Sequence, residues 1–389
     1  RLSFKYALRQ CKSNEETARA DSMAKDSSQK DYNAFWNKIS ATNNKKVPLP
    51  EYIEGVTGEE NISEMWHDHF KLLLNSVDNN KHRNAVERLL AMDTSCSDKE
   101  VTASEIKGII ADLKLGKACG CDTLAAEHLK YADAKLCILL SMIFTGMLSH
   151  GYLPDNLMKT IIVPIIKDKA GDMTSKGNYR PIALTTVFSK LLEHCLLDRC
   201  KLMLHTHDNQ FGFKRGHSTD ACLFALKQTI QYYRQHNSPV FVCCLDASKA
   251  FDRVNHWTLF KVLLDRGVKP FVVKLLRFWY ERQTFSIQWG SALSSWFSSS
   301  NGVRQGGILS PQLFNVYMDN LSDRLLACGA GCNINNVWLN HIMYADDLTL
   351  LCPSAKGLQI LIDICASYAE EFDIIFRSEE HTSELQSRQ

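Results

Sequence analysis

The sequence predicts an α+β fold in which an antiparallel sheet is backed by helices. Val240 to Leu245 is an apolar, β-branched-rich run, typical of a strand buried on both faces, and it ends at Asp246. The stretch from His341 to Leu351 has apolar flanks around two adjacent aspartates, which predicts two short strands joined by a tight turn. Asp346 and Asp347 are expected at the tip of that turn.

These aspartates are candidate metal ligands. Asp346 and Asp347 repel each other by several kcal/mol at close range unless a cation lies between them. An isolated Asp-Asp pair more often only marks a turn, but Asp246 at the end of a neighbouring strand favours a metal site. Carboxylate oxygens suit Mg²⁺ or Mn²⁺. Two such ions held by shared carboxylates perform in-line phosphoryl transfer, one lowering the pKa of the attacking hydroxyl and the other holding a triphosphate.

A calcium-binding module or a metal nuclease is the alternative use of these carboxylates. Calcium loops take their ligands from about 12 contiguous residues, whereas Asp246 and Asp346 lie 100 positions apart. The spacing therefore argues against a calcium loop.

Composition limits the other possibilities. With 389 residues, 45% of them hydrophobic and 23% charged, the chain has the material for a large core and two or three subdomains. The net charge of +2 does not by itself indicate a nucleic-acid-binding protein, so any basic surface must be local. The 14 cysteines have no framework spacing and are expected to be reduced thiols of an intracellular protein without disulfides. No apolar run approaches the ~20 residues of a membrane span. Because the first residue is Arg, we expect a fragment.

The N-terminal part is expected to be a basic arm followed by helices. Residues 1–46 carry ten Lys or Arg against five Asp or Glu and include Phe35 and Trp36, which predicts either a solvated helical arm or an arm near nucleic acid. Residues 47–60 contain Pro and Gly and are expected to be a linker. Residues 61–160 are expected to be helical. Within them, a capping box at Thr102 and Glu105 begins a helix that ends at Gly116.

The middle of the chain predicts a hairpin and then helices. Ile161 to Ile166 and Tyr179 to Leu184 are expected to be its two strands. A helix with one apolar face follows, on which lie Phe188, Leu191, Leu192, Cys195 and Leu196. Another is capped by Ser218. Phe211 and Phe213 before it are expected either in the core or against a template strand.

The C-terminal part completes the sheet. Phe285 to Gln288 and Ser295 to Ser298 are expected to form a polar hairpin. Ser310 is expected to cap an amphipathic helix that has Pro311 in its first turn and that Gly329 stops. A last helix is followed by a strand over Phe372 to Phe376.

Five motifs in this order resemble those of reverse transcriptases, and their wording is closest to LINE-type (non-LTR) retrotransposon polymerases. They are NYRPIALTTVFSKLLE, QFGFKRGHSTDACL, LDASKAFD, GVRQGGILSP and YADD. The segment GKACGCDTLAAEHLK also resembles an entry motif of that family, which more often has Pro where Cys119 and Cys121 stand. The resemblance implies a right-hand polymerase fold with fingers at 161–239, a palm at 240–376, and the thumb missing. Residues 377–389 do not resemble the family and are expected to be translated sequencing adapter.

The resemblance also implies roles for individual residues. Asp246, Asp346 and Asp347 would be the catalytic metal ligands. The expected nucleotide-binding residues are Lys167 and Arg180 on the triphosphate, Phe251 as a steric gate against ribose, Ala247, Gln305 and Gly306. The expected template- or primer-binding residues are Lys214, Arg215, Gly307 and Tyr344. Lys167 and Arg180 could instead be ordinary surface charges and Phe251 a core residue, while Asp252 is expected either to bind metal or to cap the helix near His256.

The function implied is RNA-directed DNA synthesis by a nucleotidyltransferase of a non-LTR retrotransposon. It would use two Mg²⁺ ions, or Mn²⁺ in their place, with an RNA template, a DNA primer or target, dNTPs and the parent element RNA as partners. No membrane is expected among them. The expected location is a cytoplasmic ribonucleoprotein and the nucleus. The alternative is a truncated or relic polymerase that binds RNA or DNA without processive synthesis, because the thumb and a Lys-containing turn are expected to be missing.

Overall fold

The computed structural model describes residues 2–28, 49–78, 80–92, 99–335 and 337–378 in two units, 1–50 and 51–389. In the first unit, α1 (Leu2–Ser28) agrees with the helical arm expected there. Phe35 and Trp36 lie outside the described residues. Among the described residues, no helix has the length and apolar character needed to cross a membrane.

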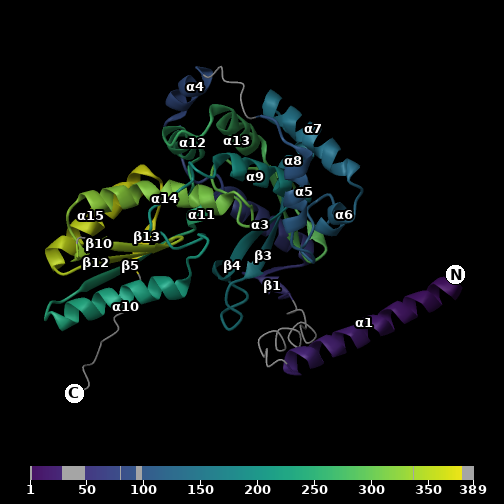
Figure 1. The fold of residues 1–389 in the computed structure, drawn as a ribbon, viewed down its shortest axis with the longest axis horizontal. Helices are drawn as coiled ribbons and strands as arrows, with labels where there is room; N and C mark the ends of the chain where they lie inside the picture. The colour runs from purple at the N-terminus through teal and green to yellow at the C-terminus, as the bar shows by residue number, and fades with distance from the viewer. Residues whose placement is uncertain (1, 29–48, 79, 93–98, 336, 379–389) are drawn as a thin grey trace. The chain divides into compact units, whose positions relative to one another are not determined.

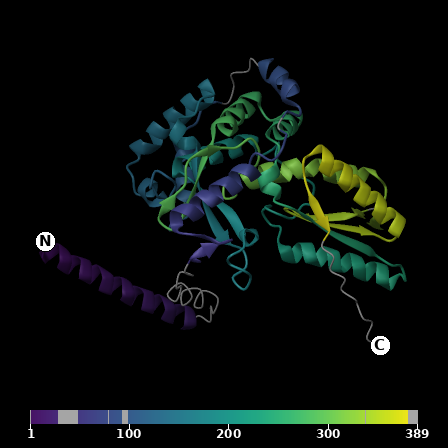
Figure 2. The same ribbon diagram turned by 180° about the vertical axis from the view of Figure 1, so that it is seen from behind.

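A four-stranded antiparallel sheet forms one half of the second unit (Figure 1). Its order is β11-β12-β5-β13, and the strands are β5 (Phe241–Ala247), β11 (His341–Tyr344), β12 (Asp347–Cys352) and β13 (Phe376–Ser378). Two helices cover one face, α14 (Ser310–Ala327) and α15 (Ala355–Glu371), and α10 (Thr219–Gln235) lies on the other (Figures 1 and 2). The predicted antiparallel sheet backed by helices is confirmed.

Two details of this sheet differ from the prediction. Strand β5 is not buried on both faces, since Phe241 and Val242 are exposed; α10 makes its main contacts with the sheet at β11. The last strand does not begin at Phe372, which is the C-cap of α15. Strand β13 instead includes Arg377 and Ser378, two residues assigned to the unrelated tail, and they pair with β5. The tail from residue 379 onward lies outside the described residues.

A second sheet of five strands is built around the predicted hairpin. The hairpin strands are β3 (Lys159–Ile166) and β4 (Tyr179–Thr185), joined by a loop containing the 3₁₀ turn η1 (Lys176–Asn178). Strand β6 (Thr284–Trp289) pairs parallel with β3, and β7 (Ala292–Leu293) and β8 (Phe297–Ser298) both pair with β6. The β6–β8 hairpin was predicted as polar, but Phe285, Ile287 and Phe297 are buried in a core that also contains Trp66.

Residues 59–158 form helices, as predicted for 61–160. They are α3 (Glu59–Leu73), α4 (Arg83–Ala91), α5 (Ala103–Asp112), α6 (Ala126–Lys130), α7 (Lys135–His150) and α8 (Asp155–Met158). Helix α3 packs on β6, while α4, α5 and α7 pack mainly on other helices. The helices that follow the two hairpin strands and β5 are α9 (Val187–Cys200), α11 (Ala250–Arg253), α12 (His256–Asp265) and α13 (Pro270–Arg282). Two short hairpins complete the fold: β1 (Tyr52–Ile53) with β2 (Val56–Thr57), and β9 (Cys332–Ile334) with β10 (Val337–Leu339). The first lies where a linker was expected, and Ile53 in it is fully buried.

Helix ends test the predicted caps. The Thr102 hydroxyl accepts from the backbone N–H of Glu105, as predicted, but the Glu105 carboxylate binds Arg199 rather than closing the capping box. Helix α5 also ends at Asp112, before Gly116. Ser218 caps α10 as predicted. Ser310 does not cap α14, because it is the first residue of that helix and not the residue before it.

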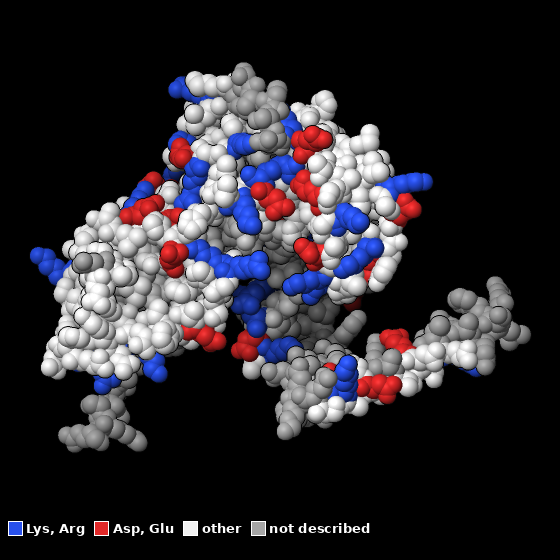
Figure 3. All heavy atoms as spheres, viewed as in Figure 1, with Lys and Arg blue, Asp and Glu red and all other residues white. Residues whose placement is uncertain are grey.

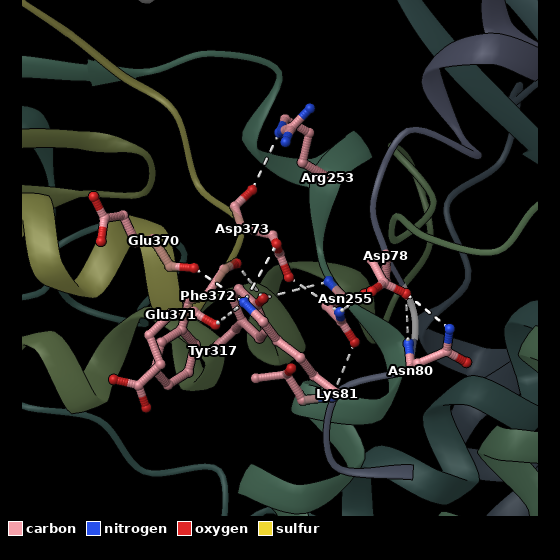
Figure 4. A network of polar contacts seen from close by, with 11 residues as sticks. Asp78, Asn80, Lys81, Arg253, Asn255, Tyr317, Glu370, Glu371, Phe372 and Asp373 are labelled. Atoms are coloured by element: carbon pink, nitrogen blue, oxygen red, sulfur yellow. Dashed lines mark hydrogen bonds and ion pairs between the residues drawn. The ribbon is translucent and has the colours of Figure 1, made fainter.

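A network of polar contacts ties the connection between α3 and α4 to the end of α15 (Figure 4). The Lys81 ammonium lies 3.6 Å from a carboxylate oxygen of Asp373. Asn255 donates both to the Asp78 carbonyl at 2.9 Å and to the Asp373 carboxylate at 3.1 Å. Arg253 donates to the Asp373 carbonyl at 3.1 Å. The helical extension is therefore bonded to the segment that leads into β13.

Candidate active site

The strand register brings the acidic motifs together. Asp347, the first residue of β12, is the direct partner of Asp246 in β5. Directly opposed residues of an antiparallel pair have Cβ atoms about 5 Å apart. Ala345 and Asp346 form the turn between β11 and β12, with Ala345 in the left-handed region at φ 59°. Residues 100 positions apart thus meet at one end of the sheet, as the sequence predicts.

The turn that carries Asp346 is supported by Gln210, which is almost fully buried. The Gln210 amide oxygen accepts from the backbone N–H groups of Ala345 and Gly212, at 2.9 and 2.8 Å, and its nitrogen donates to the Ala345 carbonyl at 3.2 Å. A Cβ at Gly212 would lie 2.2 Å from the Ala345 nitrogen. The close approach therefore requires glycine. Nothing local in the sequence marks this support, because the contacts between Gln210 and Ala345 span 135 residues.

A cavity of about 740 Å³ opens beside the acidic residues and is lined by most of the predicted site residues. Those that line it are Lys167, Arg180, Asp246, Ala247, Phe251, Gln305, Gly306, Gly307 and Asp346. Asp252, left open between two roles, also lines it. It does not cap α12, because Asn255 does so through its side chain.

The cavity combines carboxylates with cations. Burial raises the pKa of the Asp346 carboxyl, and the charges of Asp347 and Asp246 raise it further. Lys176 and Lys249, which sequence analysis did not single out, line the cavity together with Lys167 and Arg180. Figure 3 shows Lys and Arg side chains gathered around the hollow in this face. The site can therefore hold a cation on its carboxylates and an anion on its lysines and arginine.

Lys249 is held in an uncommon backbone conformation, at φ 50°. Burial lowers the pKa of its ammonium, as do the charges of Lys167 and Arg377, while Asp252 raises it. A non-glycine residue at positive φ is unfavourable, and so is an ammonium held beside a second one. An anion bound between Lys249 and Lys167 would relieve the repulsion.

The carboxylates offer hard oxygen donors, which is the donor set that Mg²⁺ and Mn²⁺ prefer. Asp246 and Asp346 line the cavity and repel each other, and a cation would remove that repulsion. Asp347 is placed differently: it is not among the lining residues, and its charge helps burial to raise the pKa of the Cys222 thiol on α10. Within the described ranges, no group of three or more His, Cys, Asp or Glu side chains is arranged as a metal centre.

Phe251 faces the cavity and also packs against the core. Its ring stacks on Phe314, with centroids 4.6 Å apart, and meets the edge of Phe213 at 5.9 Å. Phe213 is about half exposed, whereas Phe211 packs in a small core beneath the sheet. The packing fixes the Phe251 ring in the wall, so it can act sterically on a bound molecule.

The loop that carries Gln305 is held by a buried ion pair. Glu193 on α9 is fully buried; its carboxylate accepts from the Arg304 guanidinium and from the backbone N–H groups of Ile308 and Leu309. Arg304 also lies over the Trp279 ring, 4.4 Å from its centroid. Glu193, at the end of the NYRPIALTTVFSKLLE motif, thus positions the loop.

The glycines of this loop allow it to lie against β4. Gly306 has φ 115°, and a Cβ on it would lie 2.9 Å from the Ala183 carbonyl oxygen. The Ala183 N–H donates to the Gln305 carbonyl at 2.7 Å. A Cβ on Gly307 would lie 2.7 Å from the Ser310 hydroxyl. A side chain at Gly306 would push the loop off the β3–β4 hairpin, and one at Gly307 would displace the Ser310 hydroxyl.

Of the predicted template- or primer-binding residues, Gly307 lines this cavity and the other three lie elsewhere. Lys214 and Arg215 line a second cavity of about 460 Å³, and Phe213 is the residue that lines both cavities. The Lys214 ammonium donates to the carbonyls of Thr206 and His207, at 2.8 and 2.5 Å. Tyr344 lies in β11, paired with Asp347.

Helix α3 supplies a wall of the catalytic cavity that the sequence did not reveal. Trp66, His69, Phe70 and Leu73 line it. Burial lowers the pKa of His69 to about 4, and the charges of Lys249 and Lys176 lower it further, so its imidazole is neutral at physiological pH. The i, i+4 pair of Trp66 and Phe70 shows that α3 is amphipathic, but nothing local indicates where its apolar side packs.

The fold and the site together define a polymerase-type palm and fingers, and comparison with known proteins supplies the family. Residues 166–382 match the family model "Reverse transcriptase (RNA-dependent DNA polymerase)". This chain belongs to the reverse transcriptase family. The resemblance drawn from the five motifs is therefore confirmed.

Three curated relatives come from retrotransposable or mobile elements. The chain is 29% identical over 58% of its length to the Pol polyprotein of the type-2 retrotransposable element R2DM of Drosophila melanogaster. It is 27% identical over 72% of its length to the RNA-directed DNA polymerase from mobile element jockey, also of Drosophila melanogaster. It is 30% identical over 52% of its length to the Pol polyprotein of the type-1 element R2 of Popillia japonica. The matches span 21%, 31% and 28% of these relatives.

Proposed function

We propose that this chain contains the fingers and palm of a non-LTR retrotransposon polymerase that extends a primer 3′-hydroxyl with dNTPs on an RNA template. The observation that carries the proposal is the pairing of β12 with β5, which sets Asp347 opposite Asp246 and Asp346 beside both. The lysines and arginine of the same cavity supply the complementary charge for a triphosphate.

Asp246 and Asp346 are the proposed ligands of the catalytic metal ions, with Asp347 as a further carboxylate at the same strand end. Reverse transcriptases use divalent metal ions, and we propose two Mg²⁺ ions here, replaceable by Mn²⁺. Bound there, the ions supply an activated primer hydroxyl and neutralise charge on the leaving pyrophosphate.

The remaining roles belong to side chains of this chain. Lys167, Arg180 and Lys249 bind the triphosphate and stabilise the charge that develops on it. Phe251 is fixed by its stacking on Phe314, so a ribose 2′-hydroxyl would collide with it. Gln305 and the two glycines after it position the nascent base pair.

The wider partners are proposals of the same kind. We propose that Lys214, Arg215 and Tyr344 contact the template or primer, that the parent element RNA and target DNA are the natural substrates, and that the protein works in a cytoplasmic ribonucleoprotein and in the nucleus. Lys214 reaches the template only by leaving the two carbonyls it binds in this structure.

Primer extension tests the proposed function. The protein is incubated with oligo(dT) on poly(rA), dTTP and either Mg²⁺ or Mn²⁺, and Asp246→Asn and Asp346→Asn are compared with Asp265→Asn on the exposed surface of α12. We expect extension by the wild type and the surface variant, and a loss of at least a hundredfold in the two site variants. Equal extension by all four proteins, or extension in EDTA, would refute the assignment.

A further inference from the structure

His69 lines the catalytic cavity from α3, and the proposed mechanism leaves it without a task. Its ring meets the rings of Trp66 and Phe70 edge to face, with centroids 5.6 and 5.1 Å apart. Both neighbours belong to the same helix and also line the cavity. The imidazole is therefore presented to the cavity from a rigid helix and does not depend on a flexible loop.

The ring nitrogens of His69 lack the partners that the buried histidines have. His67, His256 and His341 are buried, and each has a hydrogen-bond partner for a ring nitrogen within the chain. The His69 ring, which is partly buried, has no hydrogen bond to any residue that the structure describes. Polar groups removed from water are normally hydrogen-bonded, so the nitrogens of His69 are suited to a partner from outside the chain.

Two ammonium groups and one carboxylate act on this imidazole. Lys176 in η1 and Lys249 before α11 line the cavity with it, and Glu54 in the turn between β1 and β2 pairs with Lys176 at 2.9 Å. Burial, together with the charges of Lys249 and Lys176, lowers the pKa of His69 to about 4, while Glu54 raises it. The imidazole is therefore neutral at physiological pH, because a proton on it would add a third cation to the group.

The remaining charged groups of the cavity are Lys167 and Arg180 and the carboxylates of Asp246, Asp252 and Asp346. The cations thus come from the β3–β4 hairpin, from its connecting loop and from the residue before α11. An imidazole that can become a further cation beside them suits an anion that carries several charges. A polyphosphate has several charges and several strong acceptor oxygens, and it is the class of ligand that this arrangement favours.

We propose that His69 is a polyphosphate-binding residue, whose imidazole takes up a proton and donates a hydrogen bond when the β- and γ-phosphates of a dNTP, or the pyrophosphate released from them, bind beside Lys176. The identity of this ligand rests on the proposed function. His69 lies outside residues 166–382, which match the family model, so this contact is a contribution of the helical extension. It acts on the leaving group and not on the base pair or the sugar.

The sign of the pH dependence follows from the charges. An opposite charge within about 4–6 Å favours the protonated form of a histidine, by as much as about 1–3 pH units in its pKa. Pyrophosphate carries several such charges, so its binding should raise the pKa of His69 from about 4 toward the physiological range. A ligand that raises a pKa binds more tightly as the pH falls toward that raised value. Pyrophosphate should therefore bind more tightly at about pH 6 than at about pH 8, by a margin that depends on His69.

The first experiment measures the protonation of His69 directly. In the whole chain labelled with ¹³C in its histidine rings, the His69 signal is assigned by its loss in His69→Gln. The pKa of His69 should rise by at least one pH unit when inorganic pyrophosphate and Mg²⁺ are added. The exposed His150 at the end of α7 is the internal control, and its titration curve should be the same with and without pyrophosphate. A His69 titration that pyrophosphate leaves unchanged would overturn the proposal.

The second experiment compares pyrophosphate binding in variants by isothermal titration calorimetry. His69→Gln keeps a hydrogen-bond donor but cannot take up a proton. Between about pH 8 and about pH 6, the affinity of the wild type should rise at least threefold more than that of His69→Gln, because the ionisation of pyrophosphate itself is common to both proteins. His150→Gln should behave as the wild type does. The same pH dependence in the wild type and His69→Gln would contradict the uptake of a proton by His69.

Glu54 provides a variant that leaves His69 in place. Its carboxylate competes with an anion for Lys176, so Glu54→Gln should bind pyrophosphate at least threefold more tightly than the wild type. Glu87→Gln removes a carboxylate from a surface pair with Arg83 and should leave the affinity unchanged. Equal or weaker binding by Glu54→Gln would contradict the placement of the anion beside Lys176. Urea unfolding of each variant shows which of them keep the fold.

Primer extension separates this inference from the proposed function. Added pyrophosphate should inhibit extension by the wild type at least threefold more strongly than extension by His69→Gln. If the wild type extends no primer while pyrophosphate still raises the pKa of His69, the polyphosphate site stands and the proposed function fails. If the wild type extends primers and pyrophosphate leaves the His69 titration unchanged, this inference alone is overturned. Absence of both effects would overturn both.

Discussion

Glu193 is expected to be one of the most sensitive positions of the fold, although it contacts no substrate. Its carboxylate is the partner of the buried Arg304 guanidinium and of two loop N–H groups. The Nε and Nη1 atoms of Arg304 are buried without a hydrogen-bond partner among the described residues. In Glu193→Gln, Arg304 would remain as a buried charge with only the Trp279 ring to face it.

The magnitude follows from that uncompensated charge. Removing one partner of a buried ion pair lowers the free energy of unfolding by about 3–5 kcal/mol. A glutamine can still accept from the Ile308 or Leu309 N–H with its one oxygen, which places the expected loss near the lower end, about 3 kcal/mol. Arg304→Met leaves the Glu193 carboxylate buried without its cation, but the Ile308 and Leu309 N–H groups still donate to it, so this variant should lower the free energy of unfolding somewhat less than Glu193→Gln.

Urea unfolding at pH 7 measures these losses, with an unchanged m-value as the sign that the same surface unfolds. The double variant Glu193→Gln/Arg304→Met should be more stable than the sum of the single losses predicts, by at least about 1 kcal/mol. Glu87→Gln is the control: Glu87 pairs with Arg83 on the surface, so its loss should stay below about 0.5 kcal/mol. A Glu193→Gln protein within about 1 kcal/mol of the wild type would refute the reasoning.

Three further predictions concern the site and its support. Gly212→Ala should lower the free energy of unfolding by about 2 kcal/mol or more and abolish primer extension, since its Cβ would lie 2.2 Å from the Ala345 nitrogen. The control is Gly146→Ala in α7, where a Cβ meets open space, and it should be neutral or stabilising in urea unfolding. Lys249→Met should raise KM for dTTP at least tenfold in steady-state extension while kcat changes less; an unchanged KM would contradict its phosphate role. Burial raises the pKa of Asp252 from 3.8 in the unfolded chain to about 7 in the folded protein. Between pH 3.8 and about pH 7 the folded state therefore binds one proton more than the unfolded state. Relative to Asp252→Asn, the wild type should therefore gain stability as pH falls from 8 to 5, by up to about 1.4 kcal/mol per pH unit below pH 7. Urea unfolding measures this slope, and a slope of opposite sign would contradict the raised pKa of Asp252.

Local sequence patterns predicted the parts of the site that depend on local chemistry. The run before Asp246 predicted a strand, and the flanks of Asp346 predicted a hairpin; that the two would meet was the hypothesis of a shared metal site. These inferences succeeded because strand pairing and turn formation leave marks on residues close in sequence.

The hydrogen bonds of Gln210 and Glu193 that support the site leave no local pattern in the sequence. In the sequence, Gln210 is a single polar residue before a turn, and Glu193 lies on the polar side of a predicted helix. Their partners lie more than a hundred residues away, and no periodicity encodes a hydrogen bond over that distance. For the same reason the contribution of α3 to the cavity was not predicted, because its apolar stripe predicts a buried face but does not indicate which residues cover that face.

That α3 lines the cavity has a practical consequence for dissecting the protein. A chain trimmed to the 166–382 segment would lack Trp66, His69 and Phe70, strand β3 and Asn301's carbonyl partner at Leu73. Such a fragment would keep all five motifs from NYRPIALTTVFSKLLE to YADD and still expose the side of the cavity that α3 covers to water. Boundaries drawn from motif similarity therefore fall inside the smallest piece that can be expected to fold and bind.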